Sequence, residues 1–526
     1  MSKKVIKWII GGIILIGLIV LAIVAQKTDL WYYLQTTLMP ENYRVVSEPR
    51  MKLMKEKGCV YDGLLTPRYT YNIHFNESVA MLDRMGCQYI HRAVETWNIP
   101  PDFREINRRL KILRDKVGPE VVVGLFFAES LDTTKSYYDP RSKKYFSYGR
   151  MCAPGTFGAW GNNTCKPSLA KREYREYVLA VAKRAIDLGI TDFTFGQIYY
   201  QDYGWKKDST IIRGIIRDLK RYGESKGLEI TVGAQTNTID NEEYLRSFDY
   251  ITGGIGQNKK GEIEQGNSCW SYYYNRSGYC WALLWHEKYK NKANNILLYL
   301  DWNNSYSDDI HRFTAMSRAK RAEFLAKAYD FFLWRDIGFL PPAGEVLGGV
   351  VSGCYGPTSE FYSASVRYSC KDETAIKDIF QGGDILPNHA QFITQEVPQI
   401  MEAGRDYEVK ITMQNNSFKI WEKTKGIKLG SVSPLDNLTW GTSRVELNEK
   451  DRIGFKEQKT FIFTVTAPRE AGEYDFQWRM VQENKEWFGK PTEKITIQVV
   501  PGKENEEAEE EVSISQNNQT GENVSE

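Results

Sequence analysis

Between about residues 55 and 380, short apolar runs alternate with segments of helical period, and this alternation limits the fold more than any other feature. The apolar runs lie at 60–65, 89–95, 121–128, 192–198, 229–234, 250–254, 296–300 and 346–352. Helical patterns separate them at 78–85, 103–117, 168–188, 209–226, 241–247, 281–290 and 312–337. Continuous runs such as VVVGLFF and NILLYL are typical of strands buried on both faces, as in parallel sheets. The pattern predicts an α/β fold, a (β/α)8 TIM-like barrel over residues 55–385, in preference to a doubly wound sheet.

From about residue 390 the apolar period changes to two. Alternating runs occur at 407–413, 460–466 and 493–499, with Gly, Pro and Asn between them. Alternation of this kind is typical of strands with one buried face. We therefore expect an all-β sandwich of Ig-like type over residues 390–500.

Four tryptophans characterise this second region. Trp421 stands alone, Trp440 lies in DNLTWG, and Trp478 and Trp487 lie in YDFQWRMVQENKEWFG, which the run EKITIQVV follows. With these residues, the segment resembles the four-tryptophan Ig-like domain of autophagy cargo receptors, which also occurs in bacterial secreted proteins. The resemblance implies a packing or docking module without chemistry of its own. The alternative is an unrelated sandwich with four aromatic core residues, and most of the rings are core residues in either case.

The N-terminus predicts a membrane anchor. Lysines within residues 1–7 precede an uncharged apolar run at 8–25. As a helix this run is about 27 Å long, close to the hydrocarbon thickness of a bilayer. Ile23 stands where a cleavable signal peptide needs a small residue, so an uncleaved anchor is favoured over a cleaved signal. The lysines should stay in the cytoplasm, which leaves the bulk of a single-pass protein outside it, at the cell surface.

These features predict the remaining organisation. Residues 1–27 form the cytoplasmic start and the transmembrane helix in the lipid bilayer, and residues 28–54 form a linker. Residues 501–526 include six Glu between 504 and 511 and almost no large apolar side chain. Such a segment buries too little surface to fold, so we expect a disordered acidic tail.

The eight cysteines predict disulfides. Their spacing pairs Cys152 with Cys165, Cys269 with Cys280 and Cys354 with Cys370, and leaves Cys59 with Cys87 as a fourth pair. Loops of this size close easily, and disulfides indicate an oxidising compartment. No two cysteines have the close spacing of a zinc site and only five His are present, so we expect no metal.

Composition excludes two further classes. Lys+Arg and Asp+Glu number 69 and 67, so no basic excess indicates a nucleic-acid partner. No G-x-G-x-x-G or P-loop follows any predicted strand, so we expect no cofactor. Aromatic residues are abundant at 13%. In open sites such rings offer flat apolar platforms for sugars.

Candidate functional residues follow from position, because the active site of a barrel lies at the carboxyl ends of its strands. The carboxylates there are the catalytic candidates: Glu95, Glu129, Asp202 and Asp301. Amides and rings at the same ends are the substrate-binding candidates: Trp97, Gln197, Tyr199, Tyr200, Gln235, Asn237, Trp302 and, in the loop between Cys269 and Cys280, Trp270. Carboxylates, amides and rings together favour a carbohydrate site.

Each catalytic candidate also has a structural interpretation. Glu95 follows Arg92 and could form an ion pair with it. Glu129 could cap the loop that follows it, and Asp202 could be a turn residue before Gly204. Asp301 has the strongest position, because a carboxylate directly after an apolar strand is costly unless it is paired or used.

The large region resembles TIM-barrel glycoside hydrolases at the level of the fold. In their commonest clan the acid and the nucleophile are Glu residues that end the fourth and the seventh strand. Here the fourth strand ends in Gln197 and Tyr199 and the seventh in Asp301, so the acid is either Asp202 or a residue of another strand such as Glu129. The leading hypothesis is a membrane-anchored extracytoplasmic glycoside hydrolase with paired carboxylates. The alternatives are a glycan- or cell-wall-binding protein with a degenerate site, and a purely structural surface protein.

Overall fold

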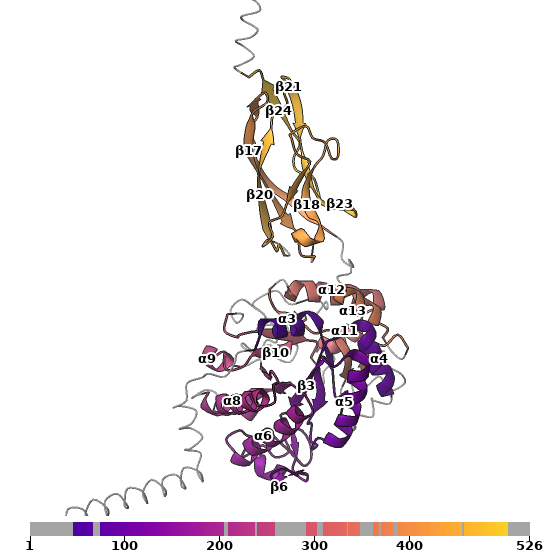
Figure 1. The fold of residues 1–526 in the computed structure, drawn as a ribbon, viewed down its shortest axis with the longest axis vertical. Coiled ribbons are helices and arrows are strands. Elements are labelled where there is room, and N and C mark those ends of the chain that lie inside the picture. The colour runs from indigo at the N-terminus through magenta and orange to yellow at the C-terminus, as the bar shows by residue number, and fades with distance from the viewer. Residues whose placement is uncertain are drawn as a thin grey trace, which may run out of the picture. The chain divides into compact units, whose positions relative to one another are not determined.

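The chain forms two compact units, residues 1–383 and 384–526. The computed structural model, drawn in Figure 1, describes the following residues: 46–66, 74–204, 209–236, 239–257, 263, 291–301, 309–333, 335–347, 361–367, 370–381, 388–417, 419–454 and 457–502. Among them no helix has the length and apolar character to cross a bilayer. The predicted anchor at 8–25 and the predicted tail beyond residue 502 lie outside the described residues.

A curled, mainly parallel sheet organises the first unit. Its strand order is β12-β11-β10-β9-β8-β3-β2-β1-β13-β14, and only β13 and β14 pair in antiparallel fashion. The strands are β1 (Gly58–Tyr61), β2 (Tyr89–Glu95), β3 (Val122–Phe127), β8 (Asp192–Phe195), β9 (Thr231–Gln235), β10 (Tyr250–Gly254), β11 (Ile296–Tyr299), β12 (Gly338–Phe339), β13 (Pro342–Val346) and β14 (Phe361–Ser363). The α/β class with a parallel sheet is confirmed.

The consecutive strands β12 and β13 pair with opposite ends of the series of strands that runs from β11 to β1. β12 pairs with β11, and β13 pairs with β1. Between them, Leu340 N donates to Leu298 O at 2.8 Å, and Pro341 O accepts from Val60 N at 3.1 Å. The last paired strand was predicted at 346–352 but begins earlier. Pro341 and Pro342 obscure it in the sequence, because proline lacks the N–H that a strand interior requires.

Helices cover the outside of the sheet, and α4, α5, α6 and α8 surround the strands in Figure 1. In α8 the apolar residues recur at helical spacing and are buried, whereas its other face carries charge. Residues 48–54 of the predicted linker belong to helix α3, which begins at Glu48 after the N-cap Ser47. The helices are α3 (Glu48–Lys57), α4 (Phe75–Met85), α5 (Phe103–Val117), α6 (Arg172–Asp187), α7 (Ile198–Gln201), α8 (Thr210–Glu224), α9 (Glu242–Leu245), α11 (Asp309–Thr314), α12 (Arg318–Leu333) and α13 (Glu373–Phe380).

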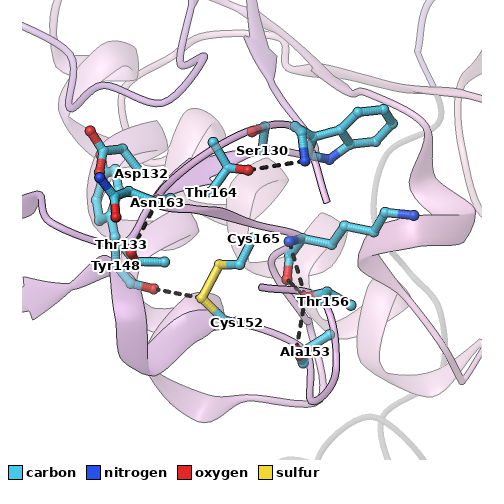
Figure 2. The surroundings of a disulfide bond; sticks show 12 residues. Ser130, Asp132, Thr133, Tyr148, Cys152, Ala153, Thr156, Asn163, Thr164 and Cys165 are labelled. Carbon is cyan, nitrogen blue, oxygen red and sulfur yellow. Dashed lines mark hydrogen bonds between the residues drawn. A yellow bond between two sulfur atoms is a disulfide. The ribbon is translucent and has the colours of Figure 1, made fainter. Parts of the chain in front are cut away.

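An insertion between β3 and α6 carries a disulfide. It consists of β4 (Leu131–Asp132), β5 (Ser136–Asp139), β6 (Lys144–Ser147), a 3-10 turn (Tyr148–Met151) and β7 (Thr164–Cys165). β4 pairs with β7, and the bond between Cys152 and Cys165 closes the loop, as Figure 2 shows.

The predicted disulfides Cys152–Cys165 and Cys59–Cys87 are confirmed. Cys370 also lies in a disulfide. Three other cysteines, Cys269, Cys280 and Cys354, fall outside the described residues.

The interior of the sheet contains a buried polar cluster. Asp192 begins β8 and accepts hydrogen bonds from Tyr89 Oη at 2.9 Å and from Tyr250 Oη at 3.0 Å. The hydroxyl of Tyr89 also lies 2.6 Å from His91 Nδ1. Burial raises the pKa of Asp192 to about 7, and all four side chains are buried.

The second unit consists of β-strands around an apolar core. Its sheets have the orders β15-β17-β20, β16-β24-β21 and β19-β18-β22-β23. Trp421, Trp440 and Trp478 are buried in the core, and Trp487 is partly buried. The strands are β15 (Ala390–Glu396), β16 (Ile400–Glu402), β17 (Asp406–Asn415), β18 (Ile427–Ser431), β19 (Arg444–Glu446), β20 (Gln458–Thr466), β21 (Gly472–Phe476), β22 (Trp478–Gln482), β23 (Glu486–Phe488) and β24 (Ile495–Val500), and one 3-10 turn spans Lys423–Lys425.

Candidate functional site

Polar side chains collect where the parallel strands of the first unit end. Glu95 ends β2, Gln235 ends β9, and Glu129, Gln197 and Asp301 follow β3, β8 and β11 by two residues each. Carboxyl ends of neighbouring parallel strands meet at one edge of a sheet. Hydrogen bonds connect four of these residues directly.

Glu129 is the most unusual carboxyl group among them. It is 1% exposed, and burial raises its pKa to about 7. Gln197 Nε2 donates to Oε1, whereas Oε2 has no hydrogen-bond partner among the described residues. A Cβ on Gly196 would stand 2.6 Å from Oε2, so only glycine allows the chain after β8 to pass this close. Glu129 therefore keeps its proton to a higher pH than an ordinary glutamate does.

Two glutamines link Glu129 to Asp301. Besides its bond to Glu129, Gln197 donates from its backbone N to Gln235 Oε1 at 3.3 Å. Gln235 Nε2 in turn donates to Asp301 Oδ2 at 2.9 Å. Gln197 has a φ of +31°, in a region that residues other than glycine rarely adopt. Such backbone strain persists where the surrounding structure enforces it, and it is frequent at functional sites.

A buried arginine pairs with two carboxyl groups beside this series of hydrogen bonds. Arg92 lies 3.1 Å from Asp62 and 2.7 Å from Glu95, and all three side chains are at most 5% exposed. Its φ is +61°, where the β2–β3 register shifts. Its guanidinium also donates to Tyr299 Oη at 3.4 Å, and that hydroxyl accepts from Gln235 Nε2 at 3.1 Å. The arginine thus connects Glu95 to the same network.

Asp202 lies apart from this network. It follows α7, and its carboxylate accepts from Tyr244 Oη at 2.9 Å and from Gly204 N at 3.1 Å. These are the contacts of the turn residue that the sequence offered as its alternative role. The described contacts do not bring it to Asp301.

Three of the aromatic candidates, Trp97, Tyr199 and Tyr200, belong to the described residues. Trp97 stacks on Phe126 at 6.5 Å between centroids. Tyr199 donates to Gln197 Oε1 at 2.8 Å and contacts Tyr200 at 4.4 Å. The other substrate-binding candidates that are still to be placed, the amide Asn237 and the rings Trp270 and Trp302, lie outside the described residues.

Sequence reasoning missed several residues of the site. Asp62 follows β1 by one residue, so the rule that found Glu129 and Asp301 applied to it as well. Arg92 was named only as a possible ion-pair partner of Glu95, and that pair is present. Tyr299 lies inside β11, and only alternation along the strand could have assigned it to the interior. Trp160 and Lys166 come from the insertion after β3. Trp160 Nε1 donates to the backbone O of Glu129 at 3.1 Å. No sequence signal pointed to these two.

The described residues contain no group of three or more His, Cys, Asp or Glu side chains that could hold a metal ion. What the site offers is one carboxyl group with a raised pKa, a second carboxylate linked to it through amides, and aromatic rings alongside. Such a set can donate a proton and hold hydroxyl groups.

Comparisons with known proteins give similarities to solved structures only. No family model and no curated protein sequence matches the chain. Eubacterium rectale Amy13B is similar at 11% identity and a TM-score of 0.40, over 81% of this chain and 99% of that one. The trehalose-6-phosphate hydrolase of Bacillus licheniformis gives 10% and 0.36, over 78% and 99%. The gamma-CGTase of Bacillus clarkii gives 8% and 0.36, over 85% and 84%.

The molecule is thus defined by its own geometry. Its first unit is an α/β protein with a curled parallel sheet and a buried carboxyl–amide network at the ends of the strands. Its second unit is built of β-strands around a core of tryptophans.

Proposed function

We propose that the first unit is a (β/α)8 barrel and acts as a glycoside hydrolase on a poly- or oligosaccharide. The observation that carries this proposal is the hydrogen-bonded series Glu129–Gln197–Gln235–Asp301. It couples two carboxyl groups of different strands in one buried network. Glycoside hydrolysis needs such a pair, one group to protonate the leaving oxygen and one to act as nucleophile or base.

The two carboxyl groups take different roles because their surroundings differ. Glu129 is the acid, since burial raises its pKa to about 7 and one of its oxygens has no partner in the described structure. Asp301 is the nucleophile or base, because it accepts a hydrogen bond from Gln235 and interacts with the charge of Arg92. A carboxyl group whose pKa is raised by burial is the usual general acid of such a pair.

In this proposal the other parts of the chain determine where the barrel is located. Residues 8–25 anchor the protein, and the barrel lies outside the cytoplasm, which the two described disulfides support. The second unit is an Ig-like module of the four-tryptophan kind and acts as a spacer or a surface attachment. Its buried tryptophans support that role, because they are used for packing.

A second candidate function is glycan binding without cleavage. The observation that favours it is Gln197, an amide at the end of β8 where a carboxyl group would serve as acid. An amide cannot act as a general acid. The hydrolase and the binding protein therefore differ in whether Glu129 supplies the acid that is missing at the end of β8.

The test is a hydrolysis and binding screen of the full chain against storage and cell-wall polysaccharides. With an active substrate, Glu129→Gln and Asp301→Asn should each lower kcat by about 10²–10⁴-fold, because each removes a proton-transfer or nucleophilic group. Asp301→Asn preserves shape and should change the melting temperature little. Glu129→Gln should also change it little near pH 5, but should raise it above pH 7, where the amide replaces a buried charge.

The control variant is Glu323→Gln on α12, an exposed carboxylate of the same unit that forms an ion pair with Lys327. It should leave both kcat and melting temperature unchanged. Binding without hydrolysis by the unaltered protein would replace the leading proposal with the binding protein. Full activity of Glu129→Gln would remove that residue from the mechanism.

A further inference from the structure

Lys166 is fixed beside Glu129 by the disulfide insertion. It directly follows Cys165, which is bonded to Cys152, and β7 pairs with β4 two residues after Glu129. The backbone of Lys166 is held at both ends: its N donates to Thr156 Oγ1 at 3.2 Å, and its O accepts from Ala153 N at 2.8 Å. Figure 2 shows Ala153 and Thr156 at this bonded position next to the disulfide.

The ammonium group of Lys166 lies on aromatic rings. Its Nζ is 3.3 Å from the centroid of Tyr200 and 5.2 Å from that of Trp160. The two rings contact each other at 5.8 Å in an edge-to-face arrangement. No ion pair of the described part of the chain includes Lys166. Burial lowers its pKa, which reflects the loss of water around the charge.

These rings and the acid belong to one closed circuit of contacts. Trp160 Nε1 donates to Glu129 O, and Glu129 accepts from Gln197. Gln197 accepts from Tyr199, and Tyr199 contacts Tyr200, which lies under Lys166 and beside Trp160. A positive charge, two ring faces and a protonatable carboxyl group with an unpartnered oxygen therefore occupy one place.

We propose that Lys166, Trp160 and Tyr200 form a subsite for a sugar that carries a negatively charged substituent. This inference rests on the carbohydrate function proposed above and specifies its substrate class as acidic glycans, such as those that contain uronic acids. The partly exposed ring of Trp160 receives the apolar face of the pyranose, and the ammonium group, which Tyr200 holds in place, binds its carboxylate. Lys166 is partly desolvated and forms no ion pair among the described residues, and an anionic ligand offsets the cost of removing water from its charge.

The experiment compares matched ligands and matched variants in the full chain. The probes are uronic-acid oligosaccharides of several backbones, each as the free acid and as its methyl ester. A further set consists of oligosaccharides without uronic acid whose only charge is a sulfate ester. The variants are Lys166→Met and Lys183→Met. Lys183 is a suitable control because its ammonium group also lies over a tyrosine ring, 5.5 Å from the centroid of Tyr222 on α8.

We expect the unaltered protein to bind at least one free acid about tenfold or more tightly than its methyl ester, the effect of one charge-assisted hydrogen bond. Lys166→Met should remove that preference without weakening the binding of the ester, and Lys183→Met should retain it. Equal affinity for acid and ester in the unaltered protein would overturn the subsite but leave the glycan function standing. Failure of every saccharide to bind would overturn both.

Two further outcomes distinguish the chemistry. Preference for the sulfate ester over every uronate would overturn the carboxylate assignment and make the anion a sulfate. A Lys166→Met variant with unchanged preference but a shifted pH profile of hydrolysis would also overturn the subsite. In that case the lysine acts only through the charge of Glu129.

Discussion

The two units place their polar side chains in opposite ways. Inside the sheet of the first unit lie Asp192 with two tyrosine hydroxyls and, nearer the strand ends, Arg92 with Asp62 and Glu95. The core of the second unit is apolar and contains buried tryptophans, and its ion pairs lie on side chains that are partly or largely exposed. The first unit therefore depends on mutual pairing of buried charges, and the second on packing.

This difference indicates where chemistry can occur. Burying a charge costs free energy unless partners satisfy it, and replacing such groups with apolar ones is often neutral or stabilising. A sheet interior that retains carboxylates, an arginine and glutamines in contact is therefore better explained by use than by stability. Among the described residues the second unit buries no carboxylate. Its buried Lys419 donates to Gln482 Oε1 at 3.0 Å, beside an otherwise apolar core, which fits a supporting role.

The largest effect should come from breaking the buried ion pairs of the first unit. Arg92→Met leaves the carboxylates of Asp62 and Glu95 buried without their cation, and should lower the free energy of unfolding by about 5 kcal/mol. Arg108→Met is the control, because this arginine is 58% exposed and pairs with Glu105 at the surface. It should leave the free energy of unfolding nearly unchanged. Denaturant unfolding of both variants checks this, and equal losses would contradict the contrast between buried and exposed pairs.

The corresponding change in the second unit removes a packed ring. Trp478 is buried, with Phe463 at 4.9 Å and Phe476 at 5.9 Å between centroids. Trp478→Ala should cost about 4 kcal/mol, the loss typical of a large aromatic side chain in a core. In calorimetry of the full chain, only the transition of the second unit should move. A shift of both transitions would contradict the independence of the two cores.

The sequence predicted the parts of the site that follow a strand. Glu95, Glu129, Gln197, Gln235 and Asp301 all come from the same argument: the first polar side chains after a buried run emerge at one edge of the sheet. Asp202 satisfied the same argument but faces Tyr244, because the short helix α7 turns the chain after Gln197. A rule that depends on position along the chain cannot include such a turn.

Residues whose role depends on three-dimensional contacts were beyond prediction. Arg92 lies within β2. Besides Glu95 it contacts Asp62, which follows β1, and Tyr299 of β11, and both are far away in sequence. Lys166 and Trp160 reach the site only through the insertion. Disulfide spacing did predict how that insertion closes, since Cys152 and Cys165 are neighbours in sequence and close a short loop.

The smallest predicted effect sharpens the comparison through pH. The folded pKa of Glu129 is about 7, whereas an ordinary glutamate titrates near 4.5. The native state therefore holds more protons than the unfolded state between these values, and stability must fall as pH rises through this window. The difference between the two pKa values corresponds to about 3 kcal/mol of unfolding free energy. This contribution is fully present below pH 4.5 and is lost above pH 7.

Glu129→Gln should remove this dependence, because the amide keeps the shape without titrating. Unfolding free energies of the first unit, measured at pH 5 and at pH 8 for both proteins, isolate the contribution as a difference of differences. Asp192, whose pKa is also raised to about 7, stays unchanged in both proteins and so cancels. The unfolding transition of the second unit provides an internal control, since Glu129→Gln should not alter its pH dependence. The same slope in both proteins would mean that Glu129 is ionised in the native state at pH 5, and this would remove it as the acid.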